Sequence, residues 1–342
     1  MRLGFSIGTL GPVAASPDDQ LRLVKEAERL GYASVWAAEG YGADPVTTMA
    51  WLAAGTTRIE LGTGVVQITG RSAVATAMAA ATVDRYSQGR FRLGLGVSGP
   101  QVTEGWHGRP YHRPLAHLRD YVAVVRQALA GEPVSHKGET LELPLPGGKE
   151  LSLAISPVRK PLPIHLAAMG PKAIALAGEL ADGWLPIHFP PEHLAASTAH
   201  LREGAARSGR ALPEVSPMVL AMVDEDPGYA CDLVRPMLTL YLGGMGTRAV
   251  NFYNRLAQRL GFGEVARRVQ EVYLEEGLGA AMDELPDELV AELALCGTPA
   301  RVRERLEAYR RAGATSVIVG PAAPTVEDRA EQLGWLAELL GP

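Results

Sequence analysis

Apolar strand-like runs alternate with amphipathic helical segments along most of the chain, and this alternation constrains the fold more than any other feature. Strands are predicted in the first part of the chain at 2–8, 34–38, 59–67 and 91–97. Helices are predicted between them at 16–31, 44–55 and 72–86. Because strands that are buried on both faces read as continuous apolar runs, this order predicts a parallel sheet covered by helices.

The same rhythm resumes after a break. Further strands are predicted at 164–168, 184–187, 215–223 and 316–319, with helices at 172–180, 191–208, 298–312 and to Leu340. Two longer segments interrupt it, a helix (114–130) with a small hairpin (136–156) and an almost entirely helical stretch. The prediction is an α/β fold, a single-domain (β/α)₈ TIM barrel over 1–342, with insertions after strands 4 and 7 at about 100–162 and 226–295. A doubly wound open sheet is the weaker alternative, because no Gly-x-Gly-x-x-Gly follows the first strand.

Charge and composition exclude several classes of protein. The net charge is −5 and the pI is near 6.0, so nothing attracts nucleic acid or an anionic membrane. No signal peptide or apolar run of membrane-spanning length is visible. Cys231 and Cys296 lie far apart in the sequence without a Cys-x-x-Cys partner, so we expect reduced core thiols and no metal site. The expected protein is cytoplasmic and acts on a small molecule.

The carboxyl ends of barrel strands locate the expected site. The residues at these ends, in chain order, are Gly8 and Thr9, Glu39, Gln67, 98–101, 169–172 and His188. The sequence lacks a Gly-x-Ser-x-Gly elbow and a His-Glu-x-x-His helix, so hydrolase and zinc-enzyme chemistry have little support. Few acid–base groups among many backbone turns suit a bound cofactor that carries the chemistry itself.

Glycines and one helix start suggest where a ligand lies. Gly62 and Gly64 in the third strand mark a bulge, a kink, a close ligand contact or simple packing beside a bulky neighbour. Gly94, Gly96 and Gly99, in or after the fourth strand, mark a close approach of the backbone or a turn where a Cβ would clash. Separately, the segment from Ala168 through Met169, Gly170, Pro171 and Lys172 opens a helix whose N–H groups favour a phosphate, with Lys172 adding charge. A merely well-capped junction is the alternative there.

A few side chains are candidates for catalysis. Glu39 is a general base, a cofactor hydrogen-bond acceptor or a salt-bridge partner. Glu104 and His107 flank Trp106 in a loop beside the site, with loop packing as the alternative for His107. His188 is weighed in the same way as His107. Arg71, in the turn after the third strand, is expected to be solvated, with phosphate binding as the alternative, and His165 is expected to be a satisfied core residue.

Six motifs in the right order resemble the luciferase-like flavin and deazaflavin oxidoreductase superfamily, and most closely its coenzyme F420-dependent branch, which includes methylenetetrahydromethanopterin reductases. These motifs are Ser34-Val-Trp-Ala-Ala-Glu39 with Gly40-Tyr-Gly-Ala-Asp44, Leu61-Gly-Thr-Gly-Val-Val-Gln67, Thr82-Val-Asp-Arg-Tyr-Ser-Gln-Gly-Arg-Phe91, Gly94-Leu-Gly-Val-Ser-Gly-Pro-Gln101 with Glu104-Gly-Trp-His-Gly108, Ala167-Ala-Met-Gly-Pro171 and Ala181-Asp-Gly-Trp-Leu-Pro186.

The resemblance implies a (β/α)₈ barrel with a cis peptide at Gly64-Val65, next to Gln67, against the deazaflavin ring. It also implies a cofactor cradle at Ser98, Gly99 and Pro100, a phosphate site over 168–172, and an acid near the ring at Glu39. Some relatives place a histidine directly after that acid, where this chain has Gly40. This departure disfavours sugar-phosphate dehydrogenase chemistry and favours hydride transfer that needs little acid–base help.

The function expected from this resemblance is an F420-dependent oxidoreductase, similar to methylenetetrahydromethanopterin reductase, that moves hydride between C5 of the deazaflavin and a small organic substrate. An FMN-dependent luciferase-like monooxygenase and a non-catalytic flavin- or deazaflavin-binding protein remain alternatives. The family also implies a homodimer or a higher homo-oligomer.

Overall fold

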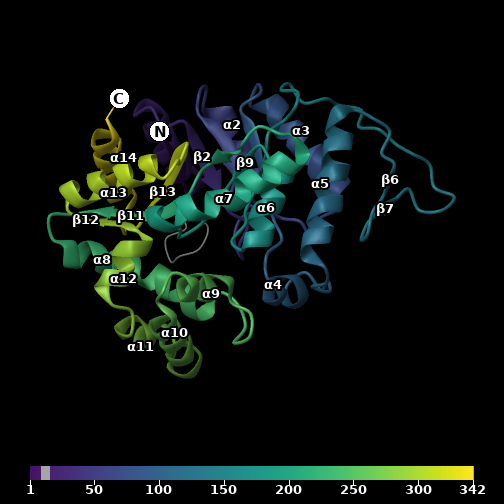
Figure 1. Ribbon diagram of the computed structural model, residues 1–342. Helices are drawn as coiled ribbons and strands as arrows, with labels where there is room; N and C mark the ends of the chain where they lie inside the picture. Colours follow the sequence, from purple (N-terminus) through teal and green to yellow (C-terminus); the bar gives the residue numbers. More distant parts are fainter. Residues whose placement is uncertain (9–15, 342) are drawn as a thin grey trace.

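The chain folds around a curled parallel sheet that is surrounded by helices (Figure 1). The structure, a computed structural model, describes residues 1–8 and 16–341, so Thr9 lies outside the described residues. The strands of the sheet run in the order β10-β9-β8-β5-β3-β2-β1-β13-β11-β12, and β4 also pairs with β5. Their bounds are β1 (Arg2–Ser6), β2 (Ser34–Ala37), β3 (Glu60–Thr63), β4 (Val66–Gln67), β5 (Phe91–Gly96), β8 (Ile164–Leu166), β9 (Gly183–Trp184), β10 (Glu214–Val215), β11 (Met218–Val223), β12 (Leu295–Gly297) and β13 (Ser316–Pro321).

One stretch of chain closes the sheet into a barrel. β10 pairs with β9, and β11, which follows after Ser216 and Pro217, pairs with β13. Residues 214–223 therefore pair with β9 through their first part and with β13 through their second part. This continuous stretch joins the two sides of the sheet, as the predicted seventh strand of the barrel requires. The prediction of a (β/α)₈ barrel is confirmed. β12 adds to the outer side of β11 and was not predicted, because three residues are too short for a periodic signal.

Helices cover the barrel, and most begin as the sequence indicates. The outer helices are α1 (Pro17–Arg29), α2 (Pro45–Gly55), α3 (Ala73–Tyr86), α5 (Pro114–Ala130), α6 (Pro171–Leu180), α7 (Pro191–Ser208), α13 (Pro299–Arg311) and α14 (Val326–Leu340). Ser16 accepts a hydrogen bond from the Asp19 N–H at 3.1 Å, and Asp44 accepts one from Thr47 at 2.7 Å. Each of these bonds satisfies one of the free N–H groups in the first turn of a helix. No helix in the described part of the chain is long and apolar enough to cross a bilayer.

Two groups of further elements depart from the repeat. Between β5 and β8 lie α4 (Pro100–Gly105), α5, and the hairpin β6 (His136–Lys137) and β7 (Glu142–Leu143), which extends away from the barrel in Figure 1. Between β11 and β12 lie α8 (Pro227–Thr239), the π-helical turn η1 (Leu240–Gly244), α9 (Phe252–Arg259), α10 (Gly263–Glu276), α11 (Leu278–Asp283) and α12 (Asp287–Leu293). Helix α4 occupies part of a segment predicted to be a polar loop, since six residues show no helical period.

The glycines of the third and fourth strands are packing positions. A Cβ built on Gly62 would collide with the Trp36 ring, and one on Gly94 would collide with the Thr63 carbonyl oxygen. A Cβ on Gly96 would lie 2.6 Å from Cγ2 of Val65. The packing alternative is therefore confirmed for Gly62, which makes room for the Trp36 ring. The close approach expected at Gly94 and Gly96 is a contact within the protein, with Thr63 at the end of β3 and with Val65.

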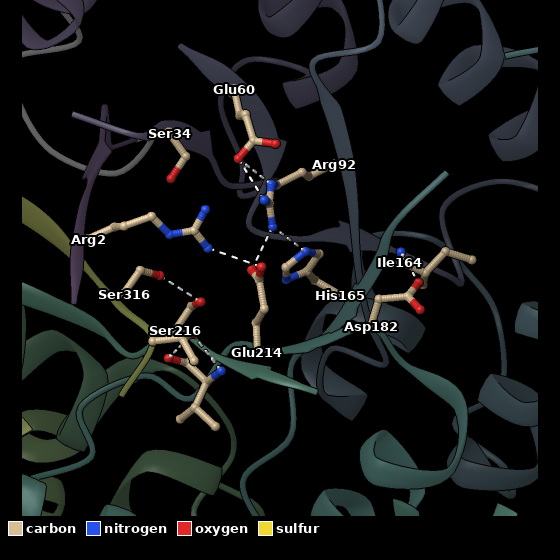
Figure 2. A network of polar contacts seen from close by, with 12 residues as sticks. Arg2, Ser34, Glu60, Arg92, Ile164, His165, Asp182, Glu214, Ser216 and Ser316 are labelled. Carbon is tan, nitrogen blue, oxygen red and sulfur yellow. Dashed lines mark hydrogen bonds and ion pairs between the residues drawn. The ribbon is translucent and has the colours of Figure 1, made fainter. Parts of the chain in front are cut away.

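A network of charged side chains fills the amino-terminal end of the barrel (Figure 2). Arg92 donates to Glu60 and Glu214, each at 2.7 Å, and Arg2 also donates to Glu214, at 3.0 Å. Arg92 also lies 3.2 Å from Nε2 of His165. His165 is buried as expected, but its Nδ1 atom has no hydrogen-bond partner. Burial and the neighbouring Arg92 lower the pKa of His165 to about 3, so the ring is neutral.

The two cysteines meet in the core although they lie far apart in the sequence. Cys231 on α8 and Cys296 on β12 are both buried, and their Sγ atoms lie 3.5 Å apart without a disulfide. Burial raises the pKa of both thiols, so both stay protonated and unreactive.

Candidate active site at the carboxyl end of the barrel

The floor of the candidate site is the break between β3 and β4. The Gly64–Val65 peptide is cis, as the family resemblance implied. The Gly64 N–H donates to the Ala37 carbonyl at 2.7 Å, and the Glu39 N–H donates to the Val65 carbonyl at 3.1 Å. Val65 and Ile187 pack over a buried cluster formed by Trp36, Leu185, Met218 and Ile318. The floor is therefore apolar and fixed to neighbouring strands by backbone hydrogen bonds.

Three predicted site residues form a polar chain along one side of this floor. A carboxylate oxygen of Glu39 accepts the Gln67 N–H at 2.5 Å, and the Gln67 side chain donates back to the Glu39 carbonyl at 3.0 Å. Nε2 of His107 lies 2.9 Å from Oε1 of Gln67. The structure thus brings Glu39, Gln67 and His107 together, with the glutamine between the other two.

Arg71 completes this side of the site, and the expectation that it is solvated was wrong. Its guanidinium forms an ion pair with Asp44 and lies 3.4 Å from the Glu39 carboxylate. The turn after β4 places Arg71 opposite the start of α2, so two carboxylates face it. Glu39 therefore has partners for both of its oxygens within the protein.

Glu104 stands apart from that chain. It is exposed on α4, and its carboxylate accepts the Tyr111 N–H at 3.1 Å. The neighbouring Trp106 is also exposed and packs edge-on against Tyr41, with ring centroids 5.8 Å apart. The two aromatic rings form a rim beside the polar chain.

The turn after β5 forms another side of the mouth. Ser98 has a left-handed backbone with φ +57°, which is uncommon for a non-glycine residue. Gly99 precedes α4, and a Cβ built on it would lie 3.6 Å from Phe252 at the start of α9. The predicted Ser98-Gly99-Pro100 cradle is half-buried and faces the long helical insertion across this gap.

The start of α6 offers an anion site. Gly170 precedes the helix, no side chain caps it, and the space where a Cβ of Gly170 would lie is open. Its first N–H groups therefore face outward with the positive end of the helix dipole. Arg259 from α9 donates to the Met169 carbonyl at 2.9 Å, which brings a guanidinium to this turn. The sequence interpretation missed Arg259, because it lies on a helical insertion distant in sequence.

The Lys172 side chain does not lie at the turn that Arg259 contacts. It is exposed and lines an outer groove of about 210 Å³ with residues of α5, including Arg119. Ala168 just before the turn is buried, and its carbonyl accepts the Trp184 indole N–H at 2.9 Å. The uncapped start of α6, with Arg259 bonded to the Met169 carbonyl, is therefore the part of this segment that is open and positively charged.

An aromatic group lies on the remaining side of the mouth. His188 contacts Tyr241 edge-on at a centroid distance of 4.6 Å, and Tyr241 contacts Tyr253 at the same distance. Asn251 fixes both tyrosines: its side chain donates to the carbonyls of Tyr241 and Leu242 and accepts the Tyr253 N–H, each at 3.0 Å. No local sequence pattern indicates that Asn251 joins these two tyrosines, because its partners lie on two different elements, η1 and α9.

These parts match those of a flavin-like cofactor. A flat apolar floor suits a planar ring, the polar chain at Glu39 and Gln67 suits its edge, and the uncapped start of α6 suits a phosphate. Among the described residues, no cluster of three or more potential ligands is arranged to hold a metal ion. The geometry therefore suits redox chemistry carried by an organic cofactor.

Comparisons with known proteins agree with this geometry. A model of the luciferase-like monooxygenase family matches residues 2–316. A putative coenzyme F420-dependent oxidoreductase of Mycobacterium tuberculosis is 38% identical and aligns over 99% of both chains. The 5,10-methylenetetrahydromethanopterin reductase of Methanolobus tindarius is 29% identical, covering 93% of this chain and 94% of the relative. The solved structure of a coenzyme F420-dependent tetrahydromethanopterin reductase from Methanopyrus kandleri has a TM-score of 0.83 at 25% identity and covers 97% of each chain.

Proposed function

The chain belongs to the luciferase-like monooxygenase family, and on this premise we propose that it is an F420-dependent oxidoreductase acting on a small organic substrate. The full-length similarity to an F420-dependent oxidoreductase and to methylenetetrahydromethanopterin reductases supports this choice of cofactor. When bound, the deazaflavin supplies a hydride donor or acceptor at C5. The substrate carries a C=N, C=C or carbonyl group, or its reduced form.

The observation that carries the proposal is the pairing of an apolar floor with an anion site at one barrel end. In the proposed complex, the floor at Val65 and Ile187 supports the ring, and the cradle at Ser98 covers its neighbouring part. The N–H groups at the start of α6, together with Arg259, hold the phosphate. Glu39 and Gln67, already bonded to each other, orient the ring edge without a proton transfer.

Equilibrium binding tests this assignment with three ligands: oxidised F420, its phosphate-free riboside and FMN. We expect F420 to bind most tightly and the riboside more weakly, because the riboside lacks a phosphate to engage the α6 anion site. FMN carries a phosphate of its own, so weaker binding of FMN than of F420 would reflect recognition of the ring. Arg259→Met should lower F420 affinity about three- to tenfold, as expected for a partly exposed charge-assisted contact, and leave riboside affinity unchanged.

Clear preference for FMN, with oxygen consumption in the presence of reduced FMN, would instead favour the monooxygenase alternative. F420 binding without turnover of any imine, enone, ketone or alcohol would favour a non-catalytic binding protein. Equal loss of F420 and riboside affinity in Arg259→Met would remove the phosphate assignment and leave the cofactor assignment in place.

A further inference from the structure

His188 is a buried polar side chain whose ring nitrogens have no partner. The residue is 5% exposed, and neither Nδ1 nor Nε2 has a hydrogen-bond partner. Its backbone has φ +55°, a left-handed conformation that is uncommon outside glycine. Buried polar groups in native proteins are nearly always hydrogen-bonded, so an unpaired imidazole indicates a missing partner.

The position of His188 links it to the reaction centre. The backbone N–H of His188 donates to the backbone carbonyl of Met218 at 3.1 Å. The Met218 side chain lies against the floor, with Cε 3.1 Å from a Cβ built on Gly64. Ile187, the preceding residue, is itself part of the apolar floor. The backbone of His188 is therefore fixed beside the floor on which the proposed cofactor ring rests, and its imidazole lines a cavity shared with Tyr241 and Tyr253.

The surroundings of the imidazole are aromatic and uncharged. Tyr241 and Tyr253 both meet the ring edge-on, at centroid distances of 4.6 and 6.3 Å. Among the described residues, those lining the adjoining cavity carry no charge, and its volume is about 10 Å³. That space is close to the minimum for a single water, so it admits one polar atom of a ligand but not its whole body.

The ring is neutral under physiological conditions. Burial lowers the pKa of His188 to about 4, so one nitrogen is a donor and the other an acceptor. The other polar candidates at the mouth already have partners: Glu39 bonds to Gln67 and Arg71, and His107 bonds to Gln67. Among Glu39, His107 and His188, only His188 has no hydrogen-bond partner for its polar side-chain atoms.

We propose that His188 binds the polar group of an uncharged substrate, with Tyr241 and Tyr253 contacting the substrate's apolar body. The substrate class is a small neutral ketone, enone, imine or secondary alcohol, since the described residues lining the cavity at the imidazole carry no charge that would pair with a phosphate there. The inference rests on the proposed F420-dependent function and names its substrate class. His188 acts as a binding and orienting residue, and no proton transfer is assigned to it.

Two variants separate this role from a structural one. His188→Asn keeps a donor and an acceptor, and asparagine tolerates a left-handed backbone; His188→Gly removes the side chain and suits the same backbone. His200→Asn, at a half-buried position on α7, is the matched control. Each protein is mixed with F420 and assayed for F420 affinity and for KM and kcat with cyclohexanone, 2-cyclohexen-1-one, a cyclic imine and cyclohexanol, with glucose 6-phosphate as the anionic comparison.

We expect His188→Gly to raise KM about three- to tenfold for the neutral compounds, as expected for one lost hydrogen bond, with smaller changes in His188→Asn. F420 affinity should stay unchanged in both variants. In the wild-type protein, neutral compounds should shift the NMR signals of the His188 ring, assigned by their loss in His188→Asn, and glucose 6-phosphate should not.

Unchanged KM in His188→Gly, or no shift of the His188 ring with any neutral compound, would overturn the proposal, as would turnover of glucose 6-phosphate in preference to them. These results leave F420 binding untouched and so leave the proposed function standing. Failure of the wild-type protein to bind F420 at all would overturn both.

Discussion

Gly94 shows how single residues position the site. A side chain there would collide with the Thr63 carbonyl oxygen, and the Thr63 hydroxyl already bonds to Gly94, accepting its N–H at 2.8 Å and donating to its carbonyl at 2.9 Å. Thr63 directly precedes the Gly64–Val65 floor. The absence of a side chain at Gly94 in β5 therefore lets β3 approach closely. Through this contact it fixes the position of the Gly64–Val65 peptide that follows Thr63.

Gly94→Ala should destabilise the protein by about 3 kcal/mol or more, because the obstructing atom is backbone and cannot rotate away. Gly334→Ala is the matched control: it lies inside α14 with open space around it, so alanine should stabilise by about 0.5–1 kcal/mol. Urea unfolding of the two variants measures both effects. Equal stability of the two would contradict the packing role.

Residue positions in the site were predictable to the extent that strand order fixes them. Glu39, Gln67 and Ser98 were placed correctly at strand ends, because carboxyl ends of parallel strands share one edge. The partners Arg71 of Glu39 and His107 of Gln67 were not predictable, since both come from turns whose direction has no sequence period. The unpaired state of His188 depends on two tyrosines more than 50 residues later, which no local pattern links to it.

At the scale of elements, the two ends of the strands have different roles. Their amino-terminal ends carry the ionic network centred on Arg92, which Figure 2 shows reaching Glu60, Glu214 and His165. Burial raises the pKa of Glu214, but the attraction of Arg92 and Arg2 outweighs it, so the net pKa is lowered. The network joins β1, β3, β5, β8 and β10 and leaves the opposite end free for ligands.

Arg92→Met should lower the unfolding free energy by about 2–4 kcal/mol, because it removes the more buried of the arginine partners from two partly buried carboxylates, leaving Glu214 with Arg2 and Glu60 with Arg159. F420 affinity should not change, since the network lies at the far end of the barrel. Arg310→Met breaks an exposed pair on α13 and should have an effect below about 1 kcal/mol. A loss of F420 affinity in Arg92→Met at full folding would show that the two ends are coupled.

Element length explains which elements the sequence could predict. Long outer helices such as α5 matched their predicted bounds, because seventeen residues contain several helical periods. The short elements α4 and β12 contain too few residues for such a signal. The hairpin was predicted over 136–156 but pairs only between β6 and β7, since the rest of that segment lacks a partner strand.

For the whole molecule, buried neutral histidines make stability depend on pH. The pKa of His165 is lowered to about 3 and that of His188 to about 4, chiefly by burial. Both pKa values lie below the value near 6.5 that a histidine has in the unfolded chain. At pH values between the folded and unfolded pKa, the unfolded chain therefore binds protons that the folded chain does not. Folding stability is therefore full above pH 7 and falls as the pH drops below about 6.5.

The unfolding free energy should decrease by up to about 1.4 kcal/mol per pH unit for each histidine between about pH 6 and 4.5. Chemical unfolding at several pH values measures this slope. His188→Asn should reduce the slope by about one proton. An identical slope in the wild-type protein and His188→Asn would contradict the buried neutral state of His188.

Asn251 couples the positions of Tyr241 and Tyr253 at the mouth of the barrel. Its one amide group holds η1 and the first turn of α9 together, so a shift of either ring pulls on the other. Altering Tyr241 and Tyr253 separately should therefore give non-additive effects, and exchanging residues 240–254 as a block would transfer a pocket shape intact. Redesign of the pocket should therefore replace residues 240–254 together and not one side chain at a time.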